Sequence, residues 1–150
     1  MSMRRCAGLF LGFFVVLNAA AFGQDKTADQ ARYSIAPDLK MYPQGTAKET
    51  LGSILKAIES KRIDYLTAQL ADPSFVDERV KRLYGGRFAE QVEDTRARLD
   101  SLTVRLLQRF LKDGDWQEDK NRVSVRLKDN GRRLSFRKEN GRWFMEHASK

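Results

Sequence analysis

The most informative stretch for the fold is Val123–His147, which reads VSVRLKDNGRRLSFRKENGRWFMEH. Apolar and polar residues alternate on both sides of Asn130-Gly131 and Asn140-Gly141. A period of two is typical of a strand with one buried face, and Asn-Gly is a strong signal for a two-residue hairpin turn. The stretch therefore predicts three antiparallel strands in a β-meander, with a further edge strand beginning near Trp116.

The two Asn-Gly turns also predict which residues pair across the sheet. A two-residue first turn places Leu127 opposite Leu134 and Val125 opposite Phe136. A two-residue second turn places Phe136 opposite Met145. Both turns put the apolar side chains on one face of the sheet: Val123, Val125, Leu127, Leu134, Phe136, Trp143 and Met145.

Upstream of the meander, the apolar residues follow a helical period. Thr46–Glu49 has the sequence of a capping box, and behind it apolar residues recur at i, i+3, i+4 and i+7 up to Ile58. This spacing predicts an amphipathic helix. The same spacing predicts a second, shorter helix that ends at Asp72-Pro73, because proline stops a helix, and a third that ends at Gly85-Gly86.

From Phe88 to Lys112 the period is again helical, and Asp113-Gly114 follows as a stop. This stretch could form one helix or two, and we favour two, with a break at Asp100-Ser101. The apolar sheet face has to be covered, and the upstream helices are available for that. We therefore predict an α+β domain in which N-terminal amphipathic helices pack on one face of a C-terminal antiparallel β-meander.

The N-terminus has the features of an export signal. Arg4-Arg5 precedes an apolar run, Leu9–Leu17, and Ala21–Gly23 places small residues where signal peptidase requires them. Cleavage before Gln24 would remove residues 1–23 as a signal peptide. The protein is therefore expected to be exported, periplasmic or secreted, with no transmembrane span after cleavage; an uncleaved signal anchor is the alternative.

The rest of the chain is expected to contain one domain. Residues 24–45 are polar, contain Pro37 and Pro43, and predict a leader or linker. Residues 46–150 then form a single α+β domain. In 150 residues, one histidine and one cysteine exclude a zinc finger, a multi-cysteine metal cluster and a disulfide scaffold. We expect no metal and no cofactor.

The positive charge of the chain is concentrated in the predicted hairpins. Residues 120–142 contain nine Lys and Arg side chains against Asp129 and Glu139. Alternation places four of them on one outward face: Arg126, Lys128, Arg133 and Arg137. Such a face keeps sheet edges soluble, or it docks on an anionic surface such as phospholipid headgroups or an acidic envelope polymer. Nucleic acid is not an expected partner, because the chain is exported and has no recognised nucleic-acid motif.

Two segments resemble the nuclear transport factor 2-like superfamily, whose members pack N-terminal helices against a curved sheet. Thr46–Pro73 is similar to the opening helix pair of that family. Asp129–His147 is similar to its closing strands, and Gly141-Arg142-Trp143 matches a Gly-Xaa-Trp that commonly starts the last one. The stretch Phe75–Gly114 has a helical period where many members have strands. The resemblance therefore implies this fold or a reduced variant of it.

Three alternatives for function remain at this stage. The favoured one is a non-enzymatic exported domain that binds a small apolar ligand or a partner, with a pocket lined by aromatic residues: Tyr84, Phe88, Trp116, Phe136 and Trp143. The second, implied by the resemblance, is an enzyme that uses an Asp or an Asp–His pair in an apolar pocket, for which Asp64, Asp100 and His147 are the candidates. The third is a nucleic-acid binder. No sequence motif of a nucleophile elbow, a Walker loop or a dinucleotide site is present.

Overall fold

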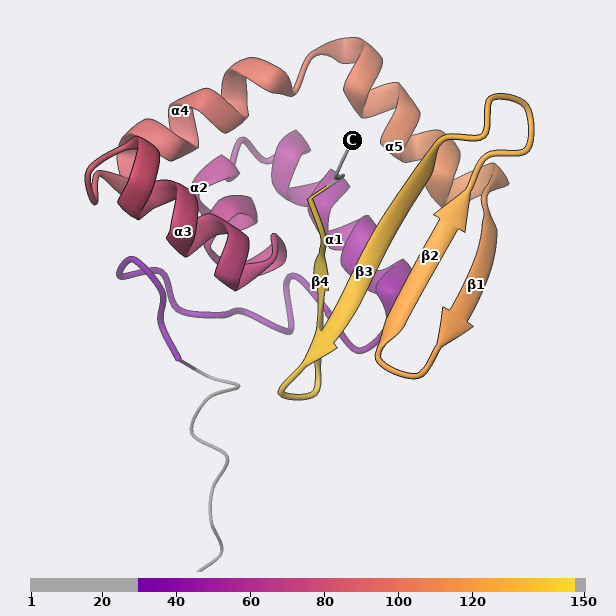
Figure 1. Cartoon of the computed structure of the whole chain (residues 1–150), viewed down its shortest axis with the longest axis horizontal. Helices are drawn as coiled ribbons and strands as arrows, with labels where there is room; N and C mark the ends of the chain where they lie inside the picture. Colours follow the sequence, from indigo (N-terminus) through magenta and orange to yellow (C-terminus); the bar gives the residue numbers. More distant parts are fainter. Residues whose placement is uncertain (1–29, 148–150) are drawn as a thin grey trace, which may run out of the picture.

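The computed structural model describes residues 30–147. The predicted signal peptide and its cleavage before Gln24 lie outside these residues. In chain order the elements are α1 (Ala47–Glu59), α2 (Ile63–Tyr65), η1 (Leu66–Leu70), α3 (Pro73–Leu83), α4 (Phe88–Arg98), α5 (Ser101–Asp113), β1 (Asp115–Asp119), β2 (Arg122–Arg126), β3 (Arg133–Glu139) and β4 (Arg142–Met145). The strands form one antiparallel sheet in the order β1-β2-β3-β4, after the helices (Figure 1). The α+β prediction is confirmed.

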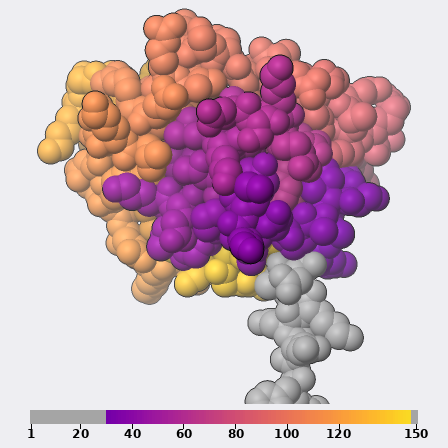
Figure 2. Space-filling model, turned by 180° about the vertical axis from the view of Figure 1, so that it is seen from behind, coloured from indigo at the N-terminus to yellow at the C-terminus, as the bar shows by residue number. Residues whose placement is uncertain are grey.

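Helix α1 begins at the predicted capping box and covers one face of the sheet. The Thr46 hydroxyl accepts a hydrogen bond from the Glu49 amide at 3.1 Å, and the Glu49 carboxylate accepts one from the Thr46 amide at 3.0 Å. Leu51 and Ile54 have no exposed surface. In Figure 1 α1 lies behind the strands, and Figure 2 shows the chain from residue 30 through α1 across the middle of the back of the molecule.

Local signals end the helices where the sequence predicts. The second helix continues from α2 into a π-helical turn, η1, in which the Ala71 amide donates to the Leu66 carbonyl at 3.0 Å. Pro73 then opens α3, and the Asp72 carboxylate caps it by accepting from the Ser74 amide at 2.9 Å. The predicted break before α5 is confirmed, because Asp100 caps that helix.

The first hairpin has a different register from the predicted one. Val125 pairs with Leu134, and the Leu127 amide donates to the Arg132 carbonyl at 3.0 Å. The loop therefore has four residues, 128–131, of which Gly131 has a positive φ of 66°. The predicted pairing of Leu127 with Leu134 is wrong by two residues. A shift of two keeps every side chain on its predicted face, because the strand period is two.

The second hairpin has the predicted register. Phe136 pairs with Met145, and Asn140 and Gly141 both have positive φ, 49° and 78°. Two consecutive positive φ values are what a type I′ turn requires. The edge strand expected near Trp116 is β1.

The apolar face of the sheet and α1 enclose the core. Val125 and Phe136 have no exposed surface, whereas Leu134 and Met145 are partly buried at the edge of the core. Helix α5 packs beside α1 on the same core, through Leu107 and Phe110.

The described part of the predicted leader, residues 30–45, packs on the domain without forming helix or strand. Tyr42 is 5% exposed and Gln44 is 2% exposed. The Gln44 side-chain amide donates to the carbonyls of Trp143 at 2.7 Å and Gln69 at 3.0 Å, and its oxygen accepts from Arg142. The domain therefore starts upstream of the boundary expected at Thr46.

Candidate functional site

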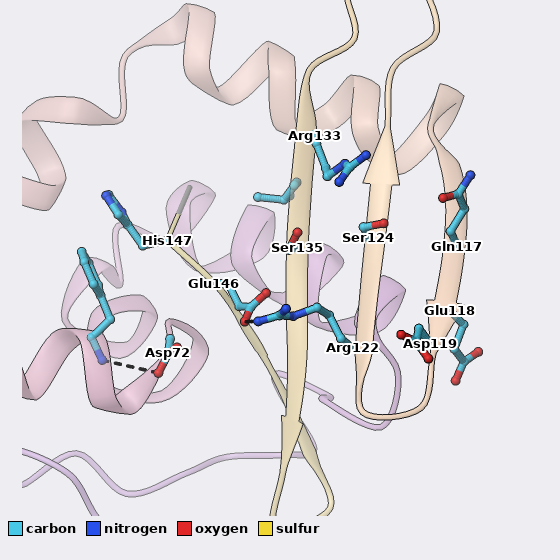
Figure 3. Close-up of a pocket in the computed structure, with 12 residues that line it drawn as sticks. Asp72, Gln117, Glu118, Asp119, Arg122, Ser124, Arg133, Ser135, Glu146 and His147 are labelled. Carbon is cyan, nitrogen blue, oxygen red and sulfur yellow. Dashed lines mark hydrogen bonds and ion pairs between the residues drawn. The ribbon is translucent and has the colours of Figure 1, made fainter. Parts of the chain in front are cut away.

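The open face of the sheet, opposite α1, carries a hollow of about 860 Å³. Small polar side chains form its floor, because Ser124 of β2 pairs with Ser135 of β3 and Gln117 of β1 lies beside Ser124 (Figure 3). On the same face of the sheet, the positions two residues before and two residues after each serine carry arginines. A row of short side chains between rows of long ones leaves the space that the hollow occupies.

Two arginines of the hollow differ in their surroundings. Arg122 forms an ion pair with Glu146 at 2.7 Å, which crosses the hollow (Figure 3). Arg133 lies at the other end and lines the same hollow. Within residues 30–147, the Arg133 guanidinium has neither an ion pair nor a side-chain hydrogen bond. Four carboxylates also line the hollow: Asp72, Glu118, Asp119 and Glu146. Asp72 and Glu146 pair with Arg137 and Arg122, and Glu118 and Asp119 lie at the end of the hollow away from Arg133 (Figure 3). Arg133 is therefore the arginine of the hollow that is available to a bound anion.

An apolar cleft of about 310 Å³ opens beside the hollow. It lies between η1, α3, α4, α5 and the ends of β3 and β4. The π turn of η1 contributes Leu66 and Thr67 to its wall. Its apolar lining consists of Leu66, Ala71, Phe75, Val76, Leu99, Leu107, Leu134 and Met145.

The cleft and the hollow share four lining residues: Phe75, Leu134, Glu146 and His147. The His147 ring stacks on the Phe75 ring, with 4.1 Å between ring centroids and 11° between planes. Desolvation lowers the pKa of the His147 imidazole, and the positive charges of Arg79 and Arg98 lower it further. The boundary between the polar hollow and the apolar cleft therefore includes an aromatic pair that is neutral near pH 7, beside the Glu146 carboxylate, which pairs with Arg122.

A polar network closes the far side of the cleft across α3 and α4. Arg79 forms an ion pair with Asp94 at 3.1 Å and donates to Gln91 at 3.0 Å. Arg98 also pairs with Asp94, at 3.1 Å. Both arginines are therefore held by protein groups.

The five predicted aromatic residues do not come together in one pocket. Two of them, Trp116 and Trp143, line a common hollow of about 330 Å³ beside the start of α1. Phe136 and Trp143 lie in the core, and the Trp116 ring packs 6.0 Å from that of Phe136. Tyr84 ends α3 and Phe88 begins α4, away from the sheet. The prediction rests on residue type, and type alone does not distinguish a core aromatic from a lining one.

The predicted basic face is only partly formed. Arg126, Lys128 and Arg133 are exposed, but Arg137 pairs with Asp72 at 3.1 Å and with Glu139 at 2.7 Å. Arg137 thus fastens the start of α3 to β3 and does not belong to an open face. Strand alternation predicts the face of a side chain and says nothing of the helix terminus that lies over it.

The three candidate ionisable residues lie apart at the surface. Asp64 pairs with Arg62 at 3.0 Å, and this hydrogen bond lowers the pKa of the Asp64 carboxyl. Asp100 is exposed and caps α5, and His147 is exposed at the strand end. None of them lies deep in an apolar pocket, so this geometry lends no support to the enzyme alternative.

The serines that form the floor of the hollow were not among the sequence-predicted site residues. Ser124 and Ser135 are the middle outward-facing residues of their strands, each flanked by arginines at i−2 and i+2. A short side chain between two long ones on the same strand face is the sequence signal that would have predicted a hollow there.

The described residues contain neither a candidate membrane span nor a candidate metal site. In residues 30–147, no helix is long and apolar enough to cross a membrane, and no group of three or more His, Cys, Asp or Glu residues could hold a metal ion. In comparisons with known proteins, the chain matches no family model, no curated protein and no solved structure.

Proposed function

We propose that the mature protein is an exported, non-enzymatic binding domain for a small amphipathic anion. The apolar part of the ligand occupies the cleft, and its anionic head lies in the hollow at Arg133. The observation that carries this proposal is the continuity of the two spaces through Phe75, Leu134, Glu146 and His147.

The chemistry of the two spaces supports a ligand with two unlike ends. A cleft of about 310 Å³ lies at the lower end of the range of small-molecule sites. Each buried methylene group contributes about 0.8 kcal/mol. Eight of them contribute about 6 kcal/mol before the ordering cost of binding. A guanidinium such as that of Arg133 binds a carboxylate or a phosphate through paired hydrogen bonds.

Export and relationship to a family are part of the same proposal. Export is supported by the signal-like segment 1–23, and a relationship to the nuclear transport factor 2-like superfamily, in reduced form, is supported by helices that precede an antiparallel sheet. The helical stretch Phe88–Asp113, where many members have strands, forms one wall of the cleft.

The test is calorimetric titration of the purified protein with decanoate, and with decanol as the neutral analogue. Arg133→Gln should weaken decanoate binding about tenfold, because one charge-assisted contact is worth about 1.5–3 kcal/mol in full and less at an exposed site. Arg126→Gln is the matched control, since Arg126 pairs with Arg133 across the strands but does not line the hollow.

A second variant addresses the cleft. Thr103→Phe adds a ring at the cleft wall and should weaken decanoate and decanol equally. The proposal fails if wild-type protein binds neither compound, or if Arg133→Gln and Arg126→Gln weaken decanoate binding to the same extent.

A further inference from the structure

Helix α5 presents an exposed stripe that is unlike its buried side. Leu102, Arg105, Arg109 and Lys112 follow each other at i, i+3, i+7 and i+10, on one side of the helix. All four are exposed, while Leu107 and Phe110 face the core. The stripe therefore combines one leucine with three cations.

Leu102 is the most exposed large apolar side chain of the described residues, at 69%. A single exposed leucine is ordinary on a protein surface. Leu102 differs because Asp100 caps the helix at this point and thereby holds the first turn of α5 in place. Arg105 follows it by one turn of the same stripe.

The β2–β3 hairpin extends this surface. Arg109 forms an ion pair with Asp129 of the hairpin loop at 2.6 Å, which fastens the loop to the C-terminal half of α5. Figure 1 shows the loop beside this end of α5. The hairpin brings three more exposed cations to the edge: Arg126, Lys128 and Arg132.

Carboxylates on the same edge reduce its charge without cancelling it. Asp113 ends α5, Asp129 pairs with Arg109, and Asp115 lies opposite Arg126 in the sheet. Six cations thus face three carboxylates along the docking edge, which we define as the exposed residues of α5 together with Asp115 and residues 126–132.

We infer that the docking edge binds the protein peripherally to an anionic lipid bilayer, with Leu102 inserted among the headgroups. A row of cations that begins one helical turn from an exposed apolar side chain and continues onto the hairpin is a combination that an anionic membrane surface attracts. The edge has no exposed aromatic residue, so it lacks the stacking platforms of single-stranded nucleic-acid sites. The binding is weak and falls with salt.

This inference is independent of the ligand site, because Arg133 and the cleft do not take part in it. Co-sedimentation of the purified protein is measured with phosphatidylcholine vesicles that contain or lack phosphatidylglycerol, at low and at high salt. We expect binding only to the anionic vesicles, and loss of this binding at high salt.

Substitutions separate the charge contribution from the leucine contribution. Arg105→Gln and Lys128→Gln should each lower the vesicle partition coefficient about fivefold. Leu102→Ser should lower it without changing its dependence on salt. Leu83→Ser is the matched control, because Leu83 is 63% exposed but ends α3, across α4 from the docking edge.

Each of the other outcomes overturns the inference. Absence of binding to anionic vesicles overturns it, and so does binding that ignores salt. An equal loss in Leu83→Ser and Leu102→Ser would show that the edge is not the contact surface. Salt-sensitive binding of a duplex DNA probe that matches vesicle binding and ignores Leu102→Ser would assign the cations to a nucleic acid instead. All four positions are exposed, and unchanged melting of each variant verifies that the fold is intact.

Discussion

Gly114 is a position where one added methyl group should destabilise the protein. It is the C-cap of α5, directly before β1, and its amide donates to the Phe110 carbonyl at 3.2 Å. Its φ of −73° and ψ of 145° are open to any residue. A Cβ atom at this position, however, would lie 2.4 Å from the Phe110 oxygen and 2.2 Å from a Val125 methyl carbon.

Neither neighbour can move away at low cost. The Phe110 oxygen belongs to the helix backbone, and Val125 is fully buried in the centre of the core. Overpacking of this kind costs about 1–3 kcal/mol. For a domain of this size the melting temperature of Gly114→Ala should fall by about 4 °C for each kcal/mol lost.

The assay is thermal melting followed by circular dichroism, with Gly52→Ala as the matched control. Gly52 lies inside α1, and no atom comes within 4 Å of the Cβ atom that the substitution adds. Because alanine favours the helix over glycine by about 1 kcal/mol, Gly52→Ala should melt above the wild type. If Gly114→Ala melts at or above the wild-type temperature, α5 does not join the sheet as described.

Three further predictions concern the core, the first helix and the histidine. Phe136→Ala should lower the free energy of unfolding in urea by about 3–5 kcal/mol, whereas Ser135→Ala, on the opposite face, should change it little; equal midpoints would show that the side chains do not lie on these faces. Thr46→Ala removes the hydroxyl of the capping box and should cost about 1 kcal/mol in the same assay. An NMR titration of His147, the only histidine, should give a pKa below 6.5 that rises in Phe75→Ala, because the ring no longer desolvates the imidazole. Folding disfavours the charged imidazole, so the contribution of neutral His147 to the free energy of unfolding is fully present above pH 6.5 and is lost as the pH falls through the lower pKa of the folded state. A pKa at or above 6.5 would contradict the stacked geometry.

The site shows how far sequence reasoning reached toward function. Arg133 was predicted to face outward, and it does, but it can contact a ligand because a hollow lies beside it. That space exists because Ser124 and Ser135 are opposite each other, which follows from a register that sequence reasoning missed by two residues. The cleft lies among η1, α3, α4, α5 and the ends of two strands. No local sequence pattern predicts that these segments lie close together in the fold.

Elements whose signals act within a few residues could be predicted from the sequence alone. The capping box at Thr46, the stop at Asp72-Pro73, the break at Asp100 and the Asn140-Gly141 turn all depend on hydrogen bonds or φ preferences between chain neighbours. Alternation along β2 and β3 likewise indicated that Val123, Val125 and Phe136 are buried, because the strand period is two. Strand β4 departs from this period, since Arg142, Trp143 and Phe144 are all buried.

Features that depend on contacts between distant segments became visible in the folded structure and not before. Gln44 is buried because it meets Gln69 and Trp143, which are 25 and 99 residues further along the chain. Arg137 does not belong to the exposed basic face, because the start of α3, 63 residues earlier in the chain, lies over β3 and binds its guanidinium. Such contacts form when the sheet and the helices pack around one core. The free energy of that packing is a sum over apolar surface and chain ordering throughout the domain, so no short stretch of sequence predicts it.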